Sequence, residues 1–260
     1  MLMPDSHHSS RTKRSAPYLQ YPDLSQYHQL KHGTFTRHGG NSHSPYDSLN
    51  TSFDVGDFNK NVAENLEIIK HTMGAHRILS TRQTHGTDVL VVDLDTLESF
   101  DASRQADAMI TNIAGVGLMI KQADCQAVIL FDPRKNVIAN VHCGWRGNVK
   151  NILGRVVKMM GHHFDCESSD LVAVIGPSLG PCCAEFITHK EIFPHSFENF
   201  RVSETHFDLW RLSSHQLVTA GIHSNNITVS EICTRCHTDR FFSYRGESVT
   251  GRFGTVVMLN

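Results

Sequence analysis

Residues 127–141 read A-V-I-L-F-D-P-R-K-N-V-I-A-N-V, two apolar runs on either side of a polar turn. Each run has the length of a β-strand, and D-P-R-K-N between two such runs is typical of a turn that joins antiparallel neighbours. The stretch therefore predicts a β-hairpin of residues 127–131 and 137–141.

The register of this hairpin determines which side chains meet near its open end. One register pairs Phe131 with Val137. It sets Cys125 opposite Cys143, whereas a slip of one residue sets Cys125 opposite His142. Directly opposed side chains have Cβ atoms about 4.5 to 5.5 Å apart, close enough for two ligands of one metal ion. The pattern leaves both registers open.

Strands and helices intermix along the rest of the chain after about Ser15. Further strands are expected at residues 78–80, 89–92, 108–111, 117–121, 171–175 and 255–259. Helices are expected at residues 59–73 and 149–160, and from an Asp208 N-cap to near Gly221. Gly74 supplies the stop of the first helix. This order predicts an α/β or α+β fold.

Length and charge restrict the classes of protein that fit. A chain of 260 residues favours one domain. We expect residues 1–30 to form an N-terminal tail and lead-in, and residues 31–260 a single catalytic domain. The 24 basic and 26 acidic residues give a net charge of -2, which offers no field for nucleic acid or an anionic membrane. With no apolar run long enough for a membrane helix and no signal segment, a soluble cytoplasmic protein with reduced thiols is expected.

The stretch C-T-R-C-H, from Cys233 to His237, matches the attachment signature of a c-type haem. Haem is attached to this signature outside the cytoplasm, where the chain is not expected, so we predict no haem. A second zinc site or a redox pair is the alternative for the two cysteines. No strand precedes G-x-G-x-x-G or a P-loop motif, so no nucleotide cofactor is expected.

Potential catalytic and metal-binding side chains are concentrated between residues 83 and 147, in Q-T-H-G-T-D, Q-A-D-C-Q and V-H-C-G-W-R-G. The hairpin brings Cys125 near His142, and the loop after residue 80 could deliver His85 to the same place. Two imidazoles and a thiolate form the three-ligand shell of a catalytic zinc ion, whose fourth position stays open for water or substrate. Spacing alone leaves another interpretation open, three unrelated residues with Cys125 as a small buried hydrophobe.

A resemblance covers nearly the whole chain from about His32. Its motifs, in order, are F-T-R-H-G-G-N-S-H-S-P-Y-D-S-L-N, Q-T-H-G, A-D-C, H-C-G-W-R-G, G-P-S-L-G-P-C-C-A-E-F, F-F-S-Y-R and G-R-F-G. Together they resemble the YfiH-type, laccase-domain family, once called multicopper polyphenol oxidases and now described as multifunctional purine nucleoside phosphorylases. The resemblance implies mixed β-sheets sandwiched by helices, as α/β/β/α layers. It also implies that His85, Cys125 and His142 are catalytic zinc ligands.

By the same resemblance the activity would be zinc-dependent. It would comprise phosphorolysis of adenosine, inosine and S-methyl-5′-thioadenosine to the free base and (methylthio)ribose 1-phosphate, together with adenosine deamination. Purine nucleosides and phosphate would bind in the cleft beside the metal. Cu²⁺ could substitute for Zn²⁺, because it binds nitrogen and sulfur ligands more tightly. The oligomeric state is left open.

Five further side chains are candidates for substrate contact. Arg37, Arg146 and Arg245 each adjoin a glycine-rich or family motif, and a guanidinium can hold phosphate through two parallel hydrogen bonds. Asn50 and Gln83 could hydrogen-bond the ribose or the base. The alternatives are solvated arginines and, for Asn50, a residue that shapes a turn.

Other side chains near these motifs have two interpretations each. Asp124 could orient a ligand imidazole as a carboxylate acceptor, or cap a strand end. Phe241, Phe242 and Tyr244 could stack on a purine, although core packing is favoured. Ala184 stands where the family pattern has an aromatic residue, which leaves the shape of the pocket open.

Rival activities are also open. A laccase-like, copper-dependent polyphenol oxidase needs many histidines, largely in H-x-H pairs, and the sequence has no such pair. A Cys/His hydrolase would use Cys125 as nucleophile and His142 as base. A protein that binds nucleosides without turnover is the third alternative.

Overall fold

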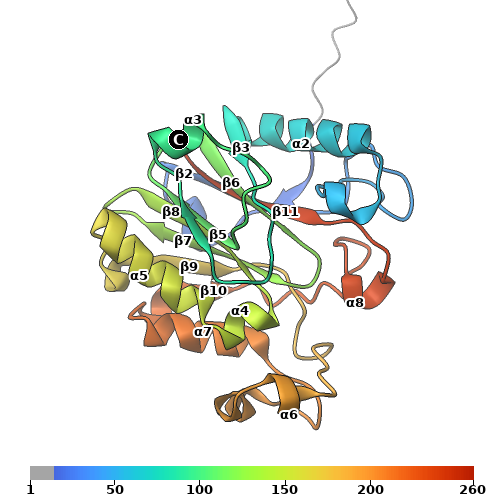
Figure 1. The fold of residues 1–260 in the computed structure, drawn as a ribbon, viewed down its shortest axis with the longest axis vertical. Helices are drawn as coiled ribbons and strands as arrows, with labels where there is room; N and C mark the ends of the chain where they lie inside the picture. Colours follow the sequence, from blue (N-terminus) through green and yellow to red (C-terminus); the bar gives the residue numbers. More distant parts are fainter. Residues whose placement is uncertain (1–14) are drawn as a thin grey trace, which may run out of the picture.

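Two β-sheets lie face to face at the centre of the structure, a computed structural model that describes residues 15–260 (Figure 1). The five-stranded sheet has the order β1 (Tyr18–Leu19), β2 (Leu30–Phe35), β11 (Phe253–Leu259), β6 (Val116–Gln122) and β3 (Arg77–Leu79). The six-stranded sheet has the order β10 (Ile227–Val229), β9 (Val172–Ile175), β7 (Gln126–Asp132), β8 (Val137–Cys143), β5 (Ala108–Thr111) and β4 (Val89–Val91). Each sheet contains parallel and antiparallel pairs.

Helices cover the outer faces of both sheets (Figure 1). Helix α2 (Asn59–Met73) packs on the five-stranded sheet, while α5 (Ile152–Phe164) and α7 (Leu209–Thr219) pack on the six-stranded sheet. The shorter helices are α1 (Pro22–Ser25), α3 (Leu94–Glu98), α4 (Trp145–Val149), α6 (His189–Ile192) and α8 (Tyr244–Glu247). The expected fold, mixed sheets between layers of helices, is confirmed.

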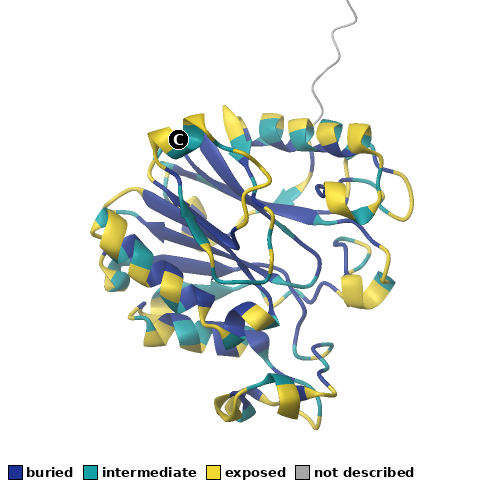
Figure 2. Ribbon diagram, in the orientation of Figure 1, coloured by how far each residue is buried: buried dark blue, intermediate teal, exposed yellow. Residues whose placement is uncertain are grey.

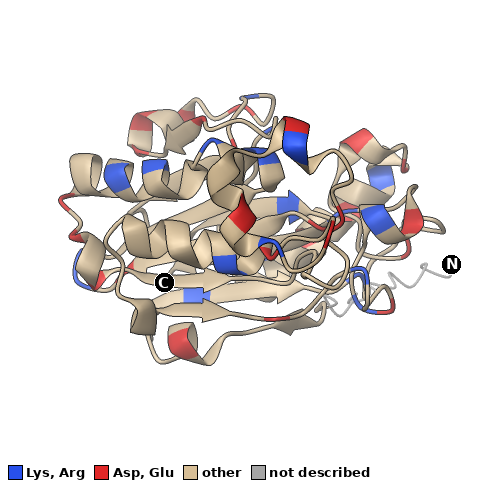
Figure 3. Cartoon of the chain, turned by 90° about the horizontal axis from the view of Figure 1, so that it is seen from below, with Lys and Arg blue, Asp and Glu red and all other residues tan. Residues whose placement is uncertain are grey.

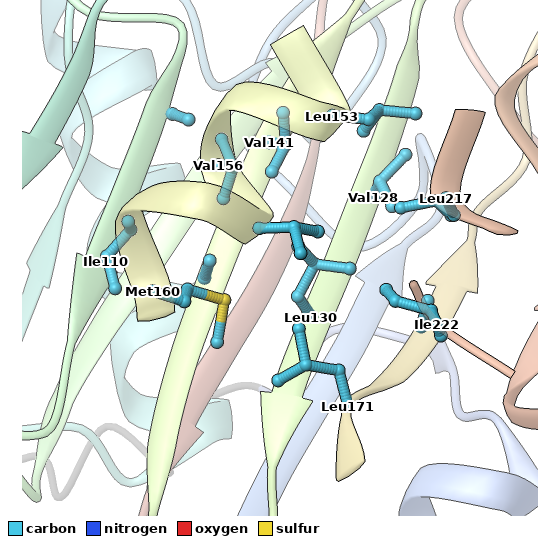
Figure 4. Close-up of a cluster of buried hydrophobic side chains, with 14 of the residues drawn as sticks. Ile110, Val128, Leu130, Val141, Leu153, Val156, Met160, Leu171, Leu217 and Ile222 are labelled. Carbon is cyan, nitrogen blue, oxygen red and sulfur yellow. The ribbon is translucent and has the colours of Figure 1, made fainter. Parts of the chain in front are cut away.

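Residues 127–131 of strand β7 are all apolar because both faces of the strand are covered. Val128 and Leu130 pack with α5 and α7 (Figure 4), and Ile129 and Phe131 pack against the five-stranded sheet. Successive residues of a strand point to opposite faces, so a strand buried on both sides reads as a continuous apolar run. The same burial extends over most central strands (Figure 2).

The expected hairpin is confirmed, but both expected registers are wrong. Asp132 pairs with Val137, and the partner of His142 is Ala127. Cys125 lies immediately before β7, outside the paired strands. The reason is local, because Asp132 belongs to the strand and its carboxylate also accepts hydrogen bonds from two backbone amides of the turn.

The expected helix at residues 59–73 is confirmed, and Gly74 ends it in the left-handed conformation, at φ 65°. The N-cap of α7 is also confirmed, since the Asp208 side chain accepts a hydrogen bond from the Arg211 amide. The expected helix at residues 149–160 is wrong at both ends. Asn151, at φ 53°, separates α4 from α5, and α5 continues beyond residue 160.

Strands β1, β2 and β10 were not expected from the sequence. Strand β2 reads L-K-H-G-T-F, and lysine and glycine are depleted in strands. A Cβ on Gly33 would come within 2.5 Å of the Tyr18 ring, so the close packing of β1 on β2 needs glycine there. Pairing with both β1 and β11 outweighs the weak local preference.

The described part of the expected lead-in, residues 15–30, packs on the five-stranded sheet through β1 and α1. The domain boundary at residue 31 stays a prediction, and residues 1–14 of the expected tail lie outside the described residues. Of the helices in residues 15–260, none has the length and hydropathy needed to cross a bilayer.

Candidate metal centre

Three side chains from distant parts of the chain meet at one end of the six-stranded sheet. His85 lies in the loop between β3 and β4, Cys125 precedes β7, and His142 lies near the end of β8. One nitrogen of each imidazole and the Cys125 Sγ all lie within 4.8 Å of one another, and this Sγ is 3.9 Å from the Nε2 of His85. These separations suit three ligands around one ion at about 2.0 to 2.3 Å. We call these residues the triad.

Asp107 fixes the orientation of the triad. The Nδ1–H of His142 donates to the Oδ1 of Asp107 at 2.8 Å, which leaves the Nε2 of His142 available to a metal ion. Asp107 is fully buried and also accepts hydrogen bonds from the backbone amides of Thr84, His85 and Gly86. One carboxylate therefore holds both the His85 loop and the His142 ring, as in the carboxylate–histidine pairs of metal sites.

The backbone around the triad has unusual conformations. His85 and Asp124 have φ values of 58° and 86°, in the left-handed region that is strained for residues with a Cβ. Gly144 follows His142 by two positions. A Cβ there would lie 2.9 Å from the Sγ of Cys125 and 3.3 Å from the His85 ring, so only glycine leaves room for the triad.

The charges around the triad shift the pKa values of Cys125, His142 and Asp107. Burial raises the pKa of the Cys125 thiol, but the His142 and His85 imidazoles outweigh burial and lower this pKa to about 6. Burial lowers the pKa of His142, but Cys125 and Asp107 outweigh it and raise this pKa to about 9. Burial also raises the pKa of Asp107, yet the hydrogen bonds from His142 and the Gly86 amide hold it well below its usual range. The chain is thus set to carry a thiolate and a carboxylate here.

Iodoacetamide is expected to alkylate Cys125 in zinc-free protein at a rate that rises as the pH passes about 6. The thiolate is the reactive form, and it prevails above the pKa of the thiol. Zinc should suppress the reaction near neutral pH, because a coordinated thiolate cannot attack. Mass-spectrometric mapping of alkylated peptides across pH, with and without added zinc, measures both effects. Equal alkylation with and without zinc would contradict a metal site and favour the cysteine hydrolase.

Two cavities open onto the triad. The first, of ≈ 210 Å³, is lined by the aromatic side chains of Trp145, Phe186 and Tyr244 and by Leu179 and Leu209. We call it the aromatic cavity. Aromatic and aliphatic walls with few polar groups are typical of sites that bind a flat organic ring.

The second cavity, of ≈ 510 Å³, is lined by the cations Lys121, Arg146 and Arg252. We call it the cationic cavity. Burial lowers the pKa of Lys121, and its Nζ has no hydrogen-bond partner in the part of the chain that the structure describes. Acidic and basic residues otherwise intermix over the fold (Figure 3), so this group of cations is a local feature. His85, Cys125, Arg146 and Tyr244 line both cavities, which places the triad at their junction.

The structure brings three of the five expected substrate residues to these cavities. Arg146 lines both of them, lies 4.2 Å from the centroid of the Trp145 ring, and forms no ion pair within residues 15–260. Arg245 lines the aromatic cavity, and its Nη1 donates to the carbonyl of Glu185. Gln83 lines the cationic cavity, where its amide exchanges two hydrogen bonds with the backbone of Lys121.

Arg37 and Asn50 line neither cavity. The guanidinium of Arg37 is buried and donates to the Thr238 carbonyl and the Glu247 carboxylate, so it holds the C-terminal end of α8. Asn50 is fully buried and bonds the backbone of its own turn and the Arg252 amide. Their polar atoms already have partners inside the protein, and substrate contact by Arg37 and Asn50 stays a prediction.

Asp124 does not orient a ligand imidazole, since Asp107 does so. The Asp124 carboxylate instead accepts hydrogen bonds from the hydroxyls of Thr234 and Ser243 and from the Arg245 amide. These bonds connect the bend before Cys125 to the C-terminal loops.

The aromatic candidates divide between core and cavity. Phe241 and Phe242 are fully buried and pack with Phe253, as favoured from the sequence. Tyr244 is 58% exposed and lines both cavities. Ala184 is fully buried in a cluster with Phe186 and Phe207, so its small side chain faces the core and lines neither cavity.

Sequence reasoning missed Asp107, Lys121, Arg252, Trp145 and Phe186. For four of these the sequence held a signal. Asp107 directly precedes an expected strand, while Trp145, Phe186 and Arg252 lie in the motifs H-C-G-W-R-G, G-P-S-L-G-P-C-C-A-E-F and G-R-F-G. Lys121 ends an apolar strand, a position with no local pattern that indicates a cavity.

The sequence matches known proteins over most of its length. A family model described as "multi-copper polyphenol oxidoreductase laccase" matches residues 31–260. A purine nucleoside phosphorylase of Bacteroides thetaiotaomicron is 32% identical, over 93% of this chain and 96% of that protein. The purine nucleoside phosphorylase YlmD of Geobacillus stearothermophilus is 30% identical, over 85% of this chain and 86% of that protein.

Solved structures resemble this fold over most of its length. The crystal structure of YlmD from Geobacillus stearothermophilus has a TM-score of 0.82 and 27% identity, and the match covers 94% of this chain and 96% of that chain. The crystal structure of YfiH from Bacillus licheniformis also has a TM-score of 0.82 and 27% identity, and covers 90% of this chain and 94% of that chain.

Proposed function

The chain belongs to the YfiH-type, laccase-domain family, and from this premise we propose that it is a purine nucleoside phosphorylase whose reaction takes place beside the triad. The curated relatives named above carry that activity in their names. Purine nucleosides and phosphate are then its substrates. In finer detail, we propose adenosine, inosine and S-methyl-5′-thioadenosine as nucleosides, with adenosine deamination as a second reaction.

The junction of the two cavities carries this proposal. An apolar, aromatic cavity and a cationic cavity meet at His85, Cys125, Arg146 and Tyr244. A nucleoside and phosphate present the complementary surfaces, a flat purine and a compact anion. Binding them on opposite sides of the junction would bring a phosphate oxygen to the ribose carbon that carries the base, and such positioning contributes much of the catalysis in a two-substrate reaction.

The residues of the cationic cavity suit the nucleophile. A phosphate oxygen must form a bond to C1′ of the ribose while the bond from C1′ to the purine nitrogen breaks. Lys121, Arg146 and Arg252 can neutralise the phosphate charge as it approaches. The purine leaves with the electrons of the broken bond and takes up the proton that hydrogen phosphate loses, beside the rings of Trp145 and Phe186.

The donor set of the triad fits a zinc ion. Two imidazoles and one thiolate, with the His142 ring held by a buried carboxylate, correspond to a three-ligand site with its fourth position open. A bound zinc ion would supply Lewis-acid polarisation of a substrate oxygen or of water, which deamination of adenosine requires. Asp107 would keep the proton of His142 on Nδ1, so that the ring stays in the tautomer that a ligand needs.

Copper-dependent oxidation of phenols has less support from the site. Among residues 15–260, the groups of side chains able to share a metal ion contain only two histidines, His85 and His142. A blue multicopper oxidase needs several such groups. The Cys/His hydrolase remains the alternative that the alkylation experiment tests.

Product analysis tests the proposed function. With inosine and phosphate, the purified protein is expected to release hypoxanthine and ribose 1-phosphate, and hypoxanthine release should stop when phosphate is omitted. S-methyl-5′-thioadenosine should yield adenine only with phosphate, whereas adenosine should yield inosine and ammonia without it. Chromatography of the bases and an ammonia assay measure these products.

Two outcomes would reject the proposal. Equal release of hypoxanthine with and without phosphate would identify a hydrolase. Binding of nucleosides without any product would identify a binding protein. Phosphorolysis without ammonia would remove deamination alone.

A further inference from the structure

Four cysteines outside the triad gather in a second cluster. Cys182 and Cys183 lie in the segment 176–188 between β9 and α6, and Cys233 and Cys236 lie in the segment 230–243 between β10 and α8. Their four Sγ atoms all lie within 4.8 Å of one another. The Sγ of Cys236 is 3.6 Å from both the Sγ of Cys182 and the Sγ of Cys183. We call these residues the thiol cluster.

The sulfur positions of the thiol cluster fit one tetrahedral ion. Four sulfurs bound to zinc at about 2.3 Å stand about 3.8 Å apart along the edges of the tetrahedron. The Sγ–Sγ separations in the thiol cluster, from 3.6 Å for two pairs up to at most 4.8 Å, span that length. A disulfide would instead hold two sulfurs at about 2.05 Å and would leave the others aside, yet Cys236 lies equally close to two neighbours.

The backbone of the thiol cluster also suits a bound metal. The amide of Gly180 donates to the Sγ of Cys233 at 3.3 Å, and such donors stabilise the negative charge of a thiolate. A Cβ on Gly180 would lie 3.1 Å from the Cβ of Cys233, so glycine lets the two segments approach. The Ser178 amide and carbonyl bond to the backbone of Ile232 and Thr234, which fixes C-x-x-C against P-C-C.

We propose that the thiol cluster is a second, structural zinc site, in which Cys182, Cys183, Cys233 and Cys236 supply all four ligands. Its shell is closed, unlike that of the triad, so it offers no position for substrate. Its task is to join two long segments that have no helices or strands of their own. The segment 176–188 carries Leu179 and Phe186 of the aromatic cavity, and the segment 230–243 directly precedes Tyr244 and Arg245 of the same cavity.

Zinc content of purified variants tests the site independently of catalysis. With both sites filled, the wild-type protein should contain about two zinc ions per chain. Cys233→Ser together with Cys236→Ser should lower the content to about one. Cys125→Ala should also retain about one, and X-ray absorption at the zinc edge should then show about four sulfur neighbours at about 2.3 Å. Cys166→Ser is the matched control, since Cys166 belongs to neither cluster, and it should keep the wild-type content.

The zinc absorption spectrum of the wild-type protein is a second test. It involves no substitution, so a folding defect of a variant cannot affect it. The spectrum should average the sulfur neighbours of both sites, about 2.5 per ion, whereas the triad alone gives about one. If the triad bound no zinc, the protein would contain one zinc ion with four sulfur neighbours. The measurement therefore tests the zinc site of the triad and the zinc site of the thiol cluster separately. Zinc with about one sulfur neighbour would overturn the structural zinc site. So would disulfides among the four cysteines, which would lower the mass of the wild-type chain by one hydrogen per cysteine.

Discussion

Replacing Cys125 with alanine is expected to empty the triad of zinc and to lower kcat/KM for phosphorolysis of inosine by more than about 100-fold. The substitution leaves two imidazoles where a catalytic zinc site needs three protein ligands. Changes in residues that only support a ligand already cost about 10- to 100-fold in affinity or activity, so loss of a ligand should cost more.

The measurement combines zinc analysis with initial rates of hypoxanthine release. Cys166→Ala is the matched control, because Cys166 is buried outside both cavities and both thiol-containing groups. Circular dichroism and the melting temperature of each variant separate metal loss from misfolding. If the Cys125→Ala protein kept a near-wild-type rate in zinc-free buffer, the triad would have no part in phosphorolysis.

Replacing Lys121 with methionine is expected to raise KM for phosphate by about 10- to 100-fold and to change KM for inosine little. Lys121 is a cation of the cationic cavity whose Nζ has no acceptor within residues 15–260, and the Asp54 carboxylate acts to raise its pKa. A hydrogen bond between charged groups contributes about 1.5 to 3 kcal/mol, which corresponds to the expected change. Methionine keeps most of the length of the side chain and removes the charge.

Steady-state rates with phosphate and inosine varied separately measure the two KM values. Lys158→Met is the matched control, since Lys158 is an exposed lysine of α5 that lines neither cavity. Adenosine deamination needs no phosphate and should be nearly unchanged in the Lys121→Met protein. Equal losses of rate in phosphorolysis and in adenosine deamination would show that Lys121 acts on folding or nucleoside binding.

Arg37 shows that a motif does not by itself indicate which anions a guanidinium contacts. It lies in T-R-H-G-G, a glycine-flanked loop that lets a guanidinium approach an anion. The anions it contacts within the protein are the carboxylates of Glu247, which is distant in sequence, and of Asp47. Lys121 reaches the cavity from the end of a buried strand, where nothing in the sequence indicates an anion site.

Local sequence patterns were sufficient to predict features that depend on residues close together in the chain. The apolar runs and turn predicted the hairpin, and Gly74 and Asp208 predicted helix ends, because capping and strand pairing depend on residues a few positions apart. Two of the failures at this level were small shifts. Asn151 divides one expected helix in two, and the strand residue Asp132 moves the hairpin register away from both expected registers.

The sequence by itself determined the layered class of the fold and, through its family motifs, the three residues of the triad. Only the tertiary structure decided that Asp107 holds His142, that an aromatic and a cationic cavity meet at the triad, and that four cysteines from two loops form a thiol cluster. Apolar periodicity and caps act between residues close in the chain, so they can be recognised along it. Hydrogen bonds, cavities and ligand groups depend on distances between segments far apart in the chain, and those distances exist only once both sheets are packed.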